Sequence, residues 1–128
     1  MKPVNLEKQI EYWKSSAFSD IETAEILIEN GKFLHGLFFC HLTIEKSLKA
    51  YYVKSIKDLA PKTHDLIYLS AKAKLPLEEK QQLFLVVLMK YQLEGRYPEY
   101  KVSIPSKENA KDYFNQTKEL LEWLIQKL

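Results

Sequence analysis

The chain has 128 residues, of which 46% are hydrophobic and 28% are charged, and its formal net charge is +2. This length supports one domain whose hydrophobic core needs no disulfide or metal, and the composition is that of an ordinary globular protein. A charge this small gives no argument for a broad nucleic-acid-binding surface, so any such contact would have to come from a local cluster.

The first predicted helix begins after Asn5 and runs to Leu27 or Ile28. Asn5 is the expected N-cap, and Asn30-Gly31 is the expected end, because glycine accepts the left-handed conformation after a helix. Apolar residues recur in it at three- and four-residue steps, which is the pattern of an amphipathic helix. They are Leu6, Ile10, Trp13, Ala17, Ile21 and Ala24.

The second predicted helix runs from about Phe33 to Ile56 and is apolar on more than one face. We therefore expect it at the centre of the fold, packed on both sides. Its C-terminal half is basic and includes Lys46 and Lys49, which share a helix face because they are three residues apart. Cys40 lies among apolar residues of this helix, so we interpret the single cysteine as a buried small hydrophobe.

A loop over residues 57–63 leads to a short helix from His64 or Asp65 to about Ala73, with Thr63 or His64 near its cap and Asp65 in its first turn. The next helix is expected from Glu78 to about Leu93. Its core, residues 83–89, is apolar all round. Such a helix must be buried on every side, either inside the monomer or across a subunit interface.

Ser106 is the expected N-cap of the last helix. The inner face of that helix carries Ala110, Tyr113, Phe114, Thr117, Leu120, Leu121 and Leu124. No alternating strand pattern of useful length occurs in the sequence. We therefore predict an all-α fold, an antiparallel up-and-down four-helix bundle with an extra short helix, as a single domain over residues 1–128.

No apolar segment is long enough to cross a membrane, and the N-terminus has no apolar core of the signal-peptide kind. One cysteine also excludes an internal disulfide, so we expect a protein of the reducing cytoplasm.

The three histidines do not form a metal motif. His35 and His41 are six residues apart and His64 lies in a loop, so no pair has the i, i+4 spacing of a helical zinc site. We expect His41 to be a hydrogen-bonded core residue and His35 to be exposed. Because no serine lies in a glycine-flanked turn and the glycines are scattered, we predict no catalytic residue, no metal and no cofactor.

The most informative residue is Arg96, the only arginine among nineteen basic residues. A planar guanidinium binds phosphate in two places, which lysine cannot do. We therefore interpret Arg96 as a phosphate ligand, with Tyr97 or Tyr100 stacking on a base. The alternative is that Arg96 pairs with Glu94 or Glu99 and only fixes the loop.

Several motifs, in this order and spacing, resemble the HEPN domain (higher eukaryotes and prokaryotes nucleotide-binding). They are Tyr12-Trp13, residues 17–24, 31–33, 38–50 and 61–66, and Arg96-Tyr97-Pro98, which together span nearly the whole chain. The resemblance implies a bundle of four or five helices that is usually dimeric. It extends to the C-terminal domain of kanamycin nucleotidyltransferase and to small proteins encoded beside minimal nucleotidyltransferases, pairs that are often toxin–antitoxin modules.

Family members with ribonuclease activity carry a histidine four to six residues after the arginine. In this chain Val102, Ser103 and their neighbours are not histidine. Tyrosine is a poor general base at neutral pH because its pKa is near 10. In some paired systems the partner transferase adds nucleotide to a tyrosine of this loop, and Tyr100 would be that residue here.

The leading hypothesis is a non-catalytic, homodimeric HEPN protein that binds a nucleotide, RNA or another phosphate-bearing substrate and acts with a nucleotidyltransferase. Its predicted ligand-binding residues are Arg96, Tyr97, Tyr100, Glu99, Lys46, Lys49 and His64. Glu45 and Asp20 would either orient the two lysines or remain solvated surface carboxylates. The alternatives are an endoribonuclease toxin with a degenerate motif, and a purely structural dimer.

Overall fold

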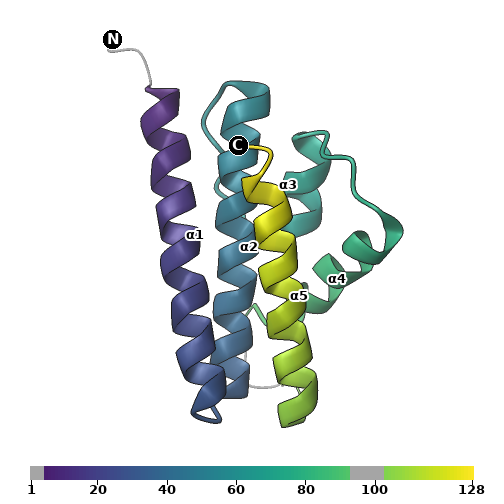
Figure 1. The fold of residues 1–128 in the computed structure, drawn as a ribbon. Coiled ribbons are helices and arrows are strands. Elements are labelled where there is room, and N and C mark those ends of the chain that lie inside the picture. The colour runs from purple at the N-terminus through teal and green to yellow at the C-terminus, as the bar shows by residue number, and fades with distance from the viewer. Residues whose placement is uncertain (1–4, 93–102) are drawn as a thin grey trace.

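The computed structural model describes residues 5–92 and 103–128, and within these ranges it contains five helices and no strand (Figure 1). The predicted all-α fold is therefore confirmed. The helices are α1 (Leu6–Glu29), α2 (Phe33–Ile56), α3 (Leu66–Lys72), α4 (Glu79–Met89) and α5 (Lys107–Ile125). Among the described helices, none has both the length and the apolar character needed to cross a membrane.

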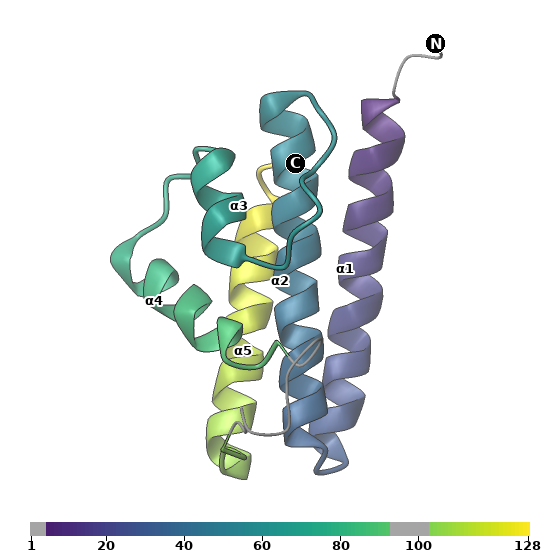
Figure 2. The same cartoon turned by 180° about the vertical axis from the view of Figure 1, so that it is seen from behind.

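Helix α2 lies at the centre of the molecule, as predicted. The long helices α1, α2 and α5 run side by side, and α3 and α4 pack on another side of α2 (Figures 1 and 2). Helix α2 contacts each of the other four helices. The molecule is therefore built around one helix that has little surface left for solvent.

The ends of α1 follow the local chemistry of the sequence. The side chain of Asn5 accepts a hydrogen bond from the backbone N–H of Lys8 at 3.0 Å, which satisfies one of the unpaired donors of the first turn. Asn30 is the C-cap, and Gly31 follows it with a φ of 78°. Both predicted boundaries are confirmed.

Two predictions for the second half of the chain need correction. Asp65 is the N-cap of α3 and does not lie in its first turn, because its carboxylate accepts from the N–H groups of Ile67 and Tyr68, each at 3.0 Å. Helix α4 ends at Met89, before the predicted Leu93. Its end tightens into turns closed by bonds from the N–H of residues 90 and 91 to carbonyls three residues earlier.

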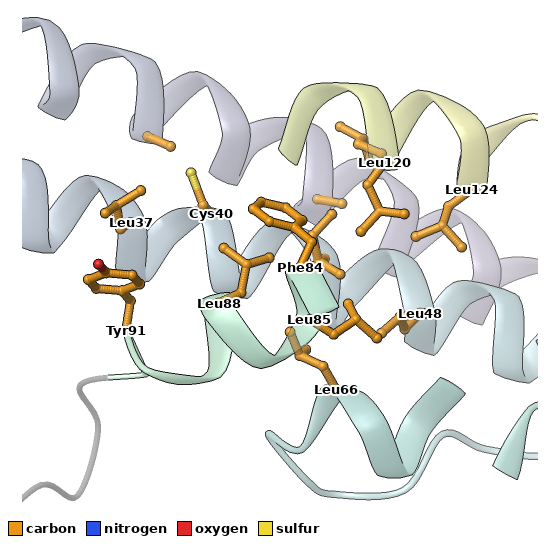
Figure 3. Close-up of a cluster of buried hydrophobic side chains, with 14 of the residues drawn as sticks. Leu37, Cys40, Leu48, Leu66, Phe84, Leu85, Leu88, Tyr91, Leu120 and Leu124 are labelled. Carbon is orange, nitrogen blue, oxygen red and sulfur yellow. The ribbon is translucent and has the colours of Figure 1, made fainter. Parts of the chain in front are cut away.

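The core joins all five helices. Figure 3 shows Phe84, Leu85 and Leu88 of α4 pointing toward α2 and α5. The labelled core residues are Leu37, Cys40, Leu48, Leu66, Phe84, Leu85, Leu88, Tyr91, Leu120 and Leu124, and all are buried. Ser106 caps α5 by accepting from the N–H of Asn109, as predicted.

Helix α4 is not buried on every side within the chain. Leu83 is 60% exposed and Val86 is 45% exposed, whereas Phe84, Leu85 and Leu88 are buried. Burial inside the monomer was one of two explanations for an all-apolar helix, and it is wrong for this outer face. The subunit interface stays a prediction.

Helices α1 and α2 approach closely at Gly36. A Cβ at this position would lie 2.4 Å from Cγ1 of Ile28 and 3.3 Å from the carbonyl oxygen of Ala24. Ile28 is itself buried, so it has little room to move. The absence of a side chain at Gly36 therefore allows the two helices to pack at this distance.

We expect Gly36→Ala to lower the free energy of unfolding by about 1–3 kcal/mol through overpacking. This is the opposite of the gain that alanine gives in a helix interior. The double variant Gly36→Ala/Ile28→Ala should lose less than the sum of the single variants, because the second change removes Cγ1. Urea denaturation of all four proteins measures this coupling. A neutral or stabilising Gly36→Ala would contradict the prediction.

Candidate functional site

The predicted ligand-binding residues fall into two groups. Arg96, Tyr97, Glu99 and Tyr100 lie outside the described residues, so their roles stay predictions. Lys46, Lys49 and His64 are described, and the structure shows which side chains surround each of them.

A buried carboxylate connects two of these residues. Glu45, in α2, is 3% exposed. One carboxylate oxygen, Oε2, accepts from Nζ of Lys49 at 3.1 Å, and the other, Oε1, lies 2.9 Å from Nδ1 of His64. Nδ1 of His41 lies 3.7 Å from Oε1. We call His41, Glu45, Lys49 and His64 the Glu45 cluster.

The sequence builds most of this cluster on one helix face. His41, Glu45 and Lys49 follow one another at four-residue steps, which places them on the same side of α2. Glutamate four residues before lysine is also the favourable order for an ion pair on a helix. His64 comes from the loop before α3, immediately ahead of the Asp65 cap that fixes the direction of that helix.

Helix α1 closes the cluster on one side. Nζ of Lys49 lies 5.0 Å from the centre of a Trp13 ring, a cation–π geometry. Tyr12 is 62% exposed and meets the Trp13 ring edge-on, with centroids 5.0 Å apart. The indole N–H of Trp13 is buried and has no hydrogen-bond partner within the described ranges. The ammonium of Lys49 is thus held between a carboxylate and an aromatic ring.

Lys46 makes a separate ion pair with α1. Its Nζ lies 2.6 Å from Oδ2 of Asp20, a residue that is 8% exposed. Asp20 and Glu45 are therefore buried partners of the two lysines, and not solvated surface carboxylates. Burying an ion pair costs desolvation energy that the attraction between the charges only partly offsets. A gain in folding stability is therefore a weak explanation for the presence of these two pairs.

The two ion pairs carry no net charge, because each consists of one lysine and one carboxylate. The side chain of His64 is 48% exposed, whereas that of Lys49 is 8% exposed. A ligand approaching the cluster from solvent would therefore meet His64 before Lys49.

The end of α4 lies next to the His64 loop. The sulfur of Met89 accepts a hydrogen bond from the backbone N–H of Leu66, two residues after His64, at 3.3 Å. The described range ends at Gln92, four residues before Arg96 in the sequence. The end of α4 is therefore in contact with the residues that follow His64.

The remaining polar candidates behave as core or surface residues. Cys40 is fully buried, and this burial raises the pKa of its thiol to about 12 although the Thr117 hydroxyl acts in the opposite direction. A thiol with this pKa stays protonated at neutral pH and is a poor nucleophile. His35 is exposed and His41 is buried, as predicted. The described residues contain no group of three possible metal ligands.

Sequence reasoning named Glu45 as a carboxylate that could orient the lysines, but it did not predict that Glu45 joins Lys49 to His64. The four-residue spacing of His41, Glu45 and Lys49 was a usable signal for a polar face on α2. No signal in the sequence linked this face to Trp13 or His64, because both contacts are made between separate elements.

Both the sequence and the fold of this chain are similar to those of known proteins. The sequence matches the family described as "HEPN domain" over residues 10–128. Among solved structures, TT1696 from Thermus thermophilus is similar with a TM-score of 0.79 and 19% sequence identity, covering 94% of this chain and 98% of that one. At this identity the likeness shows a shared fold. The search of curated proteins finds no match.

We expect Glu45→Ala to lower the free energy of unfolding by about 3–5 kcal/mol, because Lys49 would stay buried without its carboxylate. Adding Lys49→Met should recover part of this loss by removing the unpaired charge. Glu25→Ala, an exposed position on α1, is the control and should change stability by less than about 0.5 kcal/mol. Urea denaturation at pH 7 is the measurement. Equal effects of Glu45→Ala and Glu25→Ala would show that the cluster contributes no net stability.

Proposed function

Since this chain belongs to the HEPN family, we propose that it is a non-catalytic subunit that binds a nucleotide or another phosphate-bearing substrate and acts with a nucleotidyltransferase. The Glu45 cluster supports this best. It keeps one lysine and two histidines in a fixed arrangement around one buried carboxylate, with His64 reaching the surface. A preorganised polar group at the surface is what recognition of a polar ligand requires.

In this proposal Arg96 binds the phosphate and Tyr97 and Tyr100 stack on or orient the base. His64 donates a further hydrogen bond at the same site. The contact between Met89 and Leu66 supports this combination, because it joins the end of α4 to the residues that follow His64. Lys46 and Lys49 act mainly by holding the cluster and α1 in place, since each is already paired with a carboxylate.

A non-catalytic role is proposed because the expected histidine is missing from the sequence around Val102 and Ser103. The thiol of Cys40 does not replace it, since it is buried and protonated. The proposed setting is a toxin–antitoxin pair in the cytoplasm, with Tyr100 as the position that a partner transferase would modify. A short nucleotidyltransferase reading frame beside this gene would favour that setting.

Thermal-shift titration of the wild type and Arg96→Ala with ATP, GTP, CTP and a short RNA tests the phosphate site. A ligand at 100 times its Kd stabilises the folded state by about 2.7 kcal/mol, a rise of several degrees in Tm. We expect this shift to disappear in Arg96→Ala, to shrink in Arg96→Lys, which lacks the planar fork, and to persist in the exposed control Lys111→Ala.

Other outcomes of this experiment identify the alternatives. No shift with any ligand, at unchanged stability of Arg96→Ala, would refute binding by the isolated chain. RNA cleavage that disappears in Arg96→Ala would show a ribonuclease. A loss of stability in Arg96→Ala, with no ligand effect in either protein, would indicate a structural role for the arginine.

We also propose that the subunit is a homodimer joined through α3 and α4. A hollow of about 480 Å³ lies between these helices, and three of the residues that line it are large, apolar and exposed. They are Leu83 (60%), Val86 (45%) and Ile67 (45%). Tyr68, the next residue of α3, is 44% exposed. Apolar side chains that gather around a hollow are typical of a protein–protein contact, and a second copy would bury the outer face of α4.

We expect the double variant Leu83→Lys/Val86→Lys to be a folded monomer, because both side chains already face solvent and the added charges would oppose association. Light scattering coupled to size-exclusion chromatography measures the mass. Ile26→Lys changes an equally exposed residue on α1 and should remain dimeric. A monomeric wild type, or a monomeric Ile26→Lys, would contradict an interface at α3 and α4.

A further inference from the structure

A groove with an apolar floor runs between α1 and α5. It has a volume of about 220 Å³. Phe18 and Ile21 line it from α1, and Phe114 and Leu121 line it from α5. Leu121 is buried, but Phe18 is 42% exposed, so one aromatic side chain of the groove is partly exposed to solvent. Neither the Glu45 cluster nor the hollow between α3 and α4 includes these residues.

The rim of this groove is acidic. Glu22 and Glu25 contribute from α1 and Glu122 from α5, against a single lysine, Lys118. Within the described part of the chain, none of these four side chains takes part in an ion pair. Three carboxylates that have no cationic partner among the described residues therefore surround an apolar floor.

The acidity extends along α1 as a whole. Helix α1 contains six acidic residues and two lysines, a difference of −4, although the whole chain carries +2. Glu25 and Glu29 lie near its C-terminal end, and its last turn has no basic residue. The C-terminal end of a helix carries partial negative charge, so carboxylates there are unfavourable unless a cation lies nearby.

We propose that the groove between α1 and α5 binds a basic amphipathic helix of a protein partner. Apolar side chains of that helix would occupy the floor, and its lysines or arginines would face Glu22, Glu25 and Glu122. We choose a basic protein helix as the partner on the basis of charge complementarity, because an acidic rim repels nucleic acid and anionic lipid. The lining residues span positions 18–25 and 114–122, which is about two helical turns or 12 Å. A groove of this length accommodates a short helix of the partner.

This surface is separate from the loop that carries His64. In Figure 1, α5 lies in front with α1 beside it, whereas the view from behind in Figure 2 shows α3 and the loop that precedes it in front of α2. The groove between α1 and α5 and the loop before α3 are therefore on opposite faces. Loss of nucleotide binding in Arg96→Ala and loss of helix binding in groove variants are independent results.

The test is a titration of the ¹⁵N-labelled full chain with a synthetic two-to-three-turn peptide of leucine and lysine, with leucines at i, i+3 and i+4 spacing. Matched probes are the same peptide with glutamate for lysine and a scrambled peptide of the same composition. We expect only the first probe to shift amide resonances, and the shifts to gather at residues 18–25 and 114–122.

Variants show whether the groove residues cause this binding. Phe18→Ser should lower the affinity for the peptide by about tenfold, because it removes an apolar contact. Glu22→Lys/Glu25→Lys should lower this affinity by a similar factor, because it reverses two charges of the rim. Lys118→Glu should strengthen it about two- to threefold. A gain of affinity cannot result from misfolding. Glu7→Lys, in the first turn of α1, is the matched control and should bind like the wild type.

Four results would overturn the proposal. They are equal binding of the glutamate peptide, shifts that fall mainly outside the two helices, the absence of any binding, and an unchanged affinity of Lys118→Glu. Concentration-dependent shifts at residues 18–25 and 114–122 without any peptide would instead show that a second copy of the chain occupies the groove, which also contradicts it.

Discussion

The central position of α2 is the constraint on which the rest of the structure depends. Residues 36–50 of α2 are all buried or half-buried, so the polar side chains among them need partners inside the molecule. Glu45 meets this requirement for Lys49, and Asp20 of α1 meets it for Lys46. Glu45 also contacts the side chain of His64, which comes from the loop before α3. The polar centre of the protein thus follows from the position of one helix.

The same arrangement gives the molecule three surfaces of different character. The loop before α3 presents His64, which is anchored by a buried carboxylate. The outer face of α4 presents Leu83 and Val86 around an apolar hollow. The groove between α1 and α5 has an apolar floor and an acidic rim. Because these surfaces differ in charge and hydrophobicity, they suit different partners and can be tested separately.

The elements themselves could be predicted closely. The bounds of α2 agree with the periodicity of its apolar residues, and Asn5 and Ser106 cap helices as their side-chain chemistry indicates. The errors lie where several local choices have similar energies. Thr63, His64 and Asp65 can all begin a helix, and Asp65 does so because its carboxylate reaches two N–H groups. The last turn of α4 is similarly a local competition between helical and tighter turns.

The sequence by itself determined the fold class, the family and the four-residue spacing that places His41, Glu45 and Lys49 on one face, since all of these depend on local periodicity and residue order. Only the tertiary structure decided that Glu45 and Asp20 are buried, that Trp13 covers Lys49, and that α4 keeps one face in solvent. Spacing along a helix fixes which side chains share a face. Which element covers that face depends on packing between distant parts of the chain, which no local pattern records.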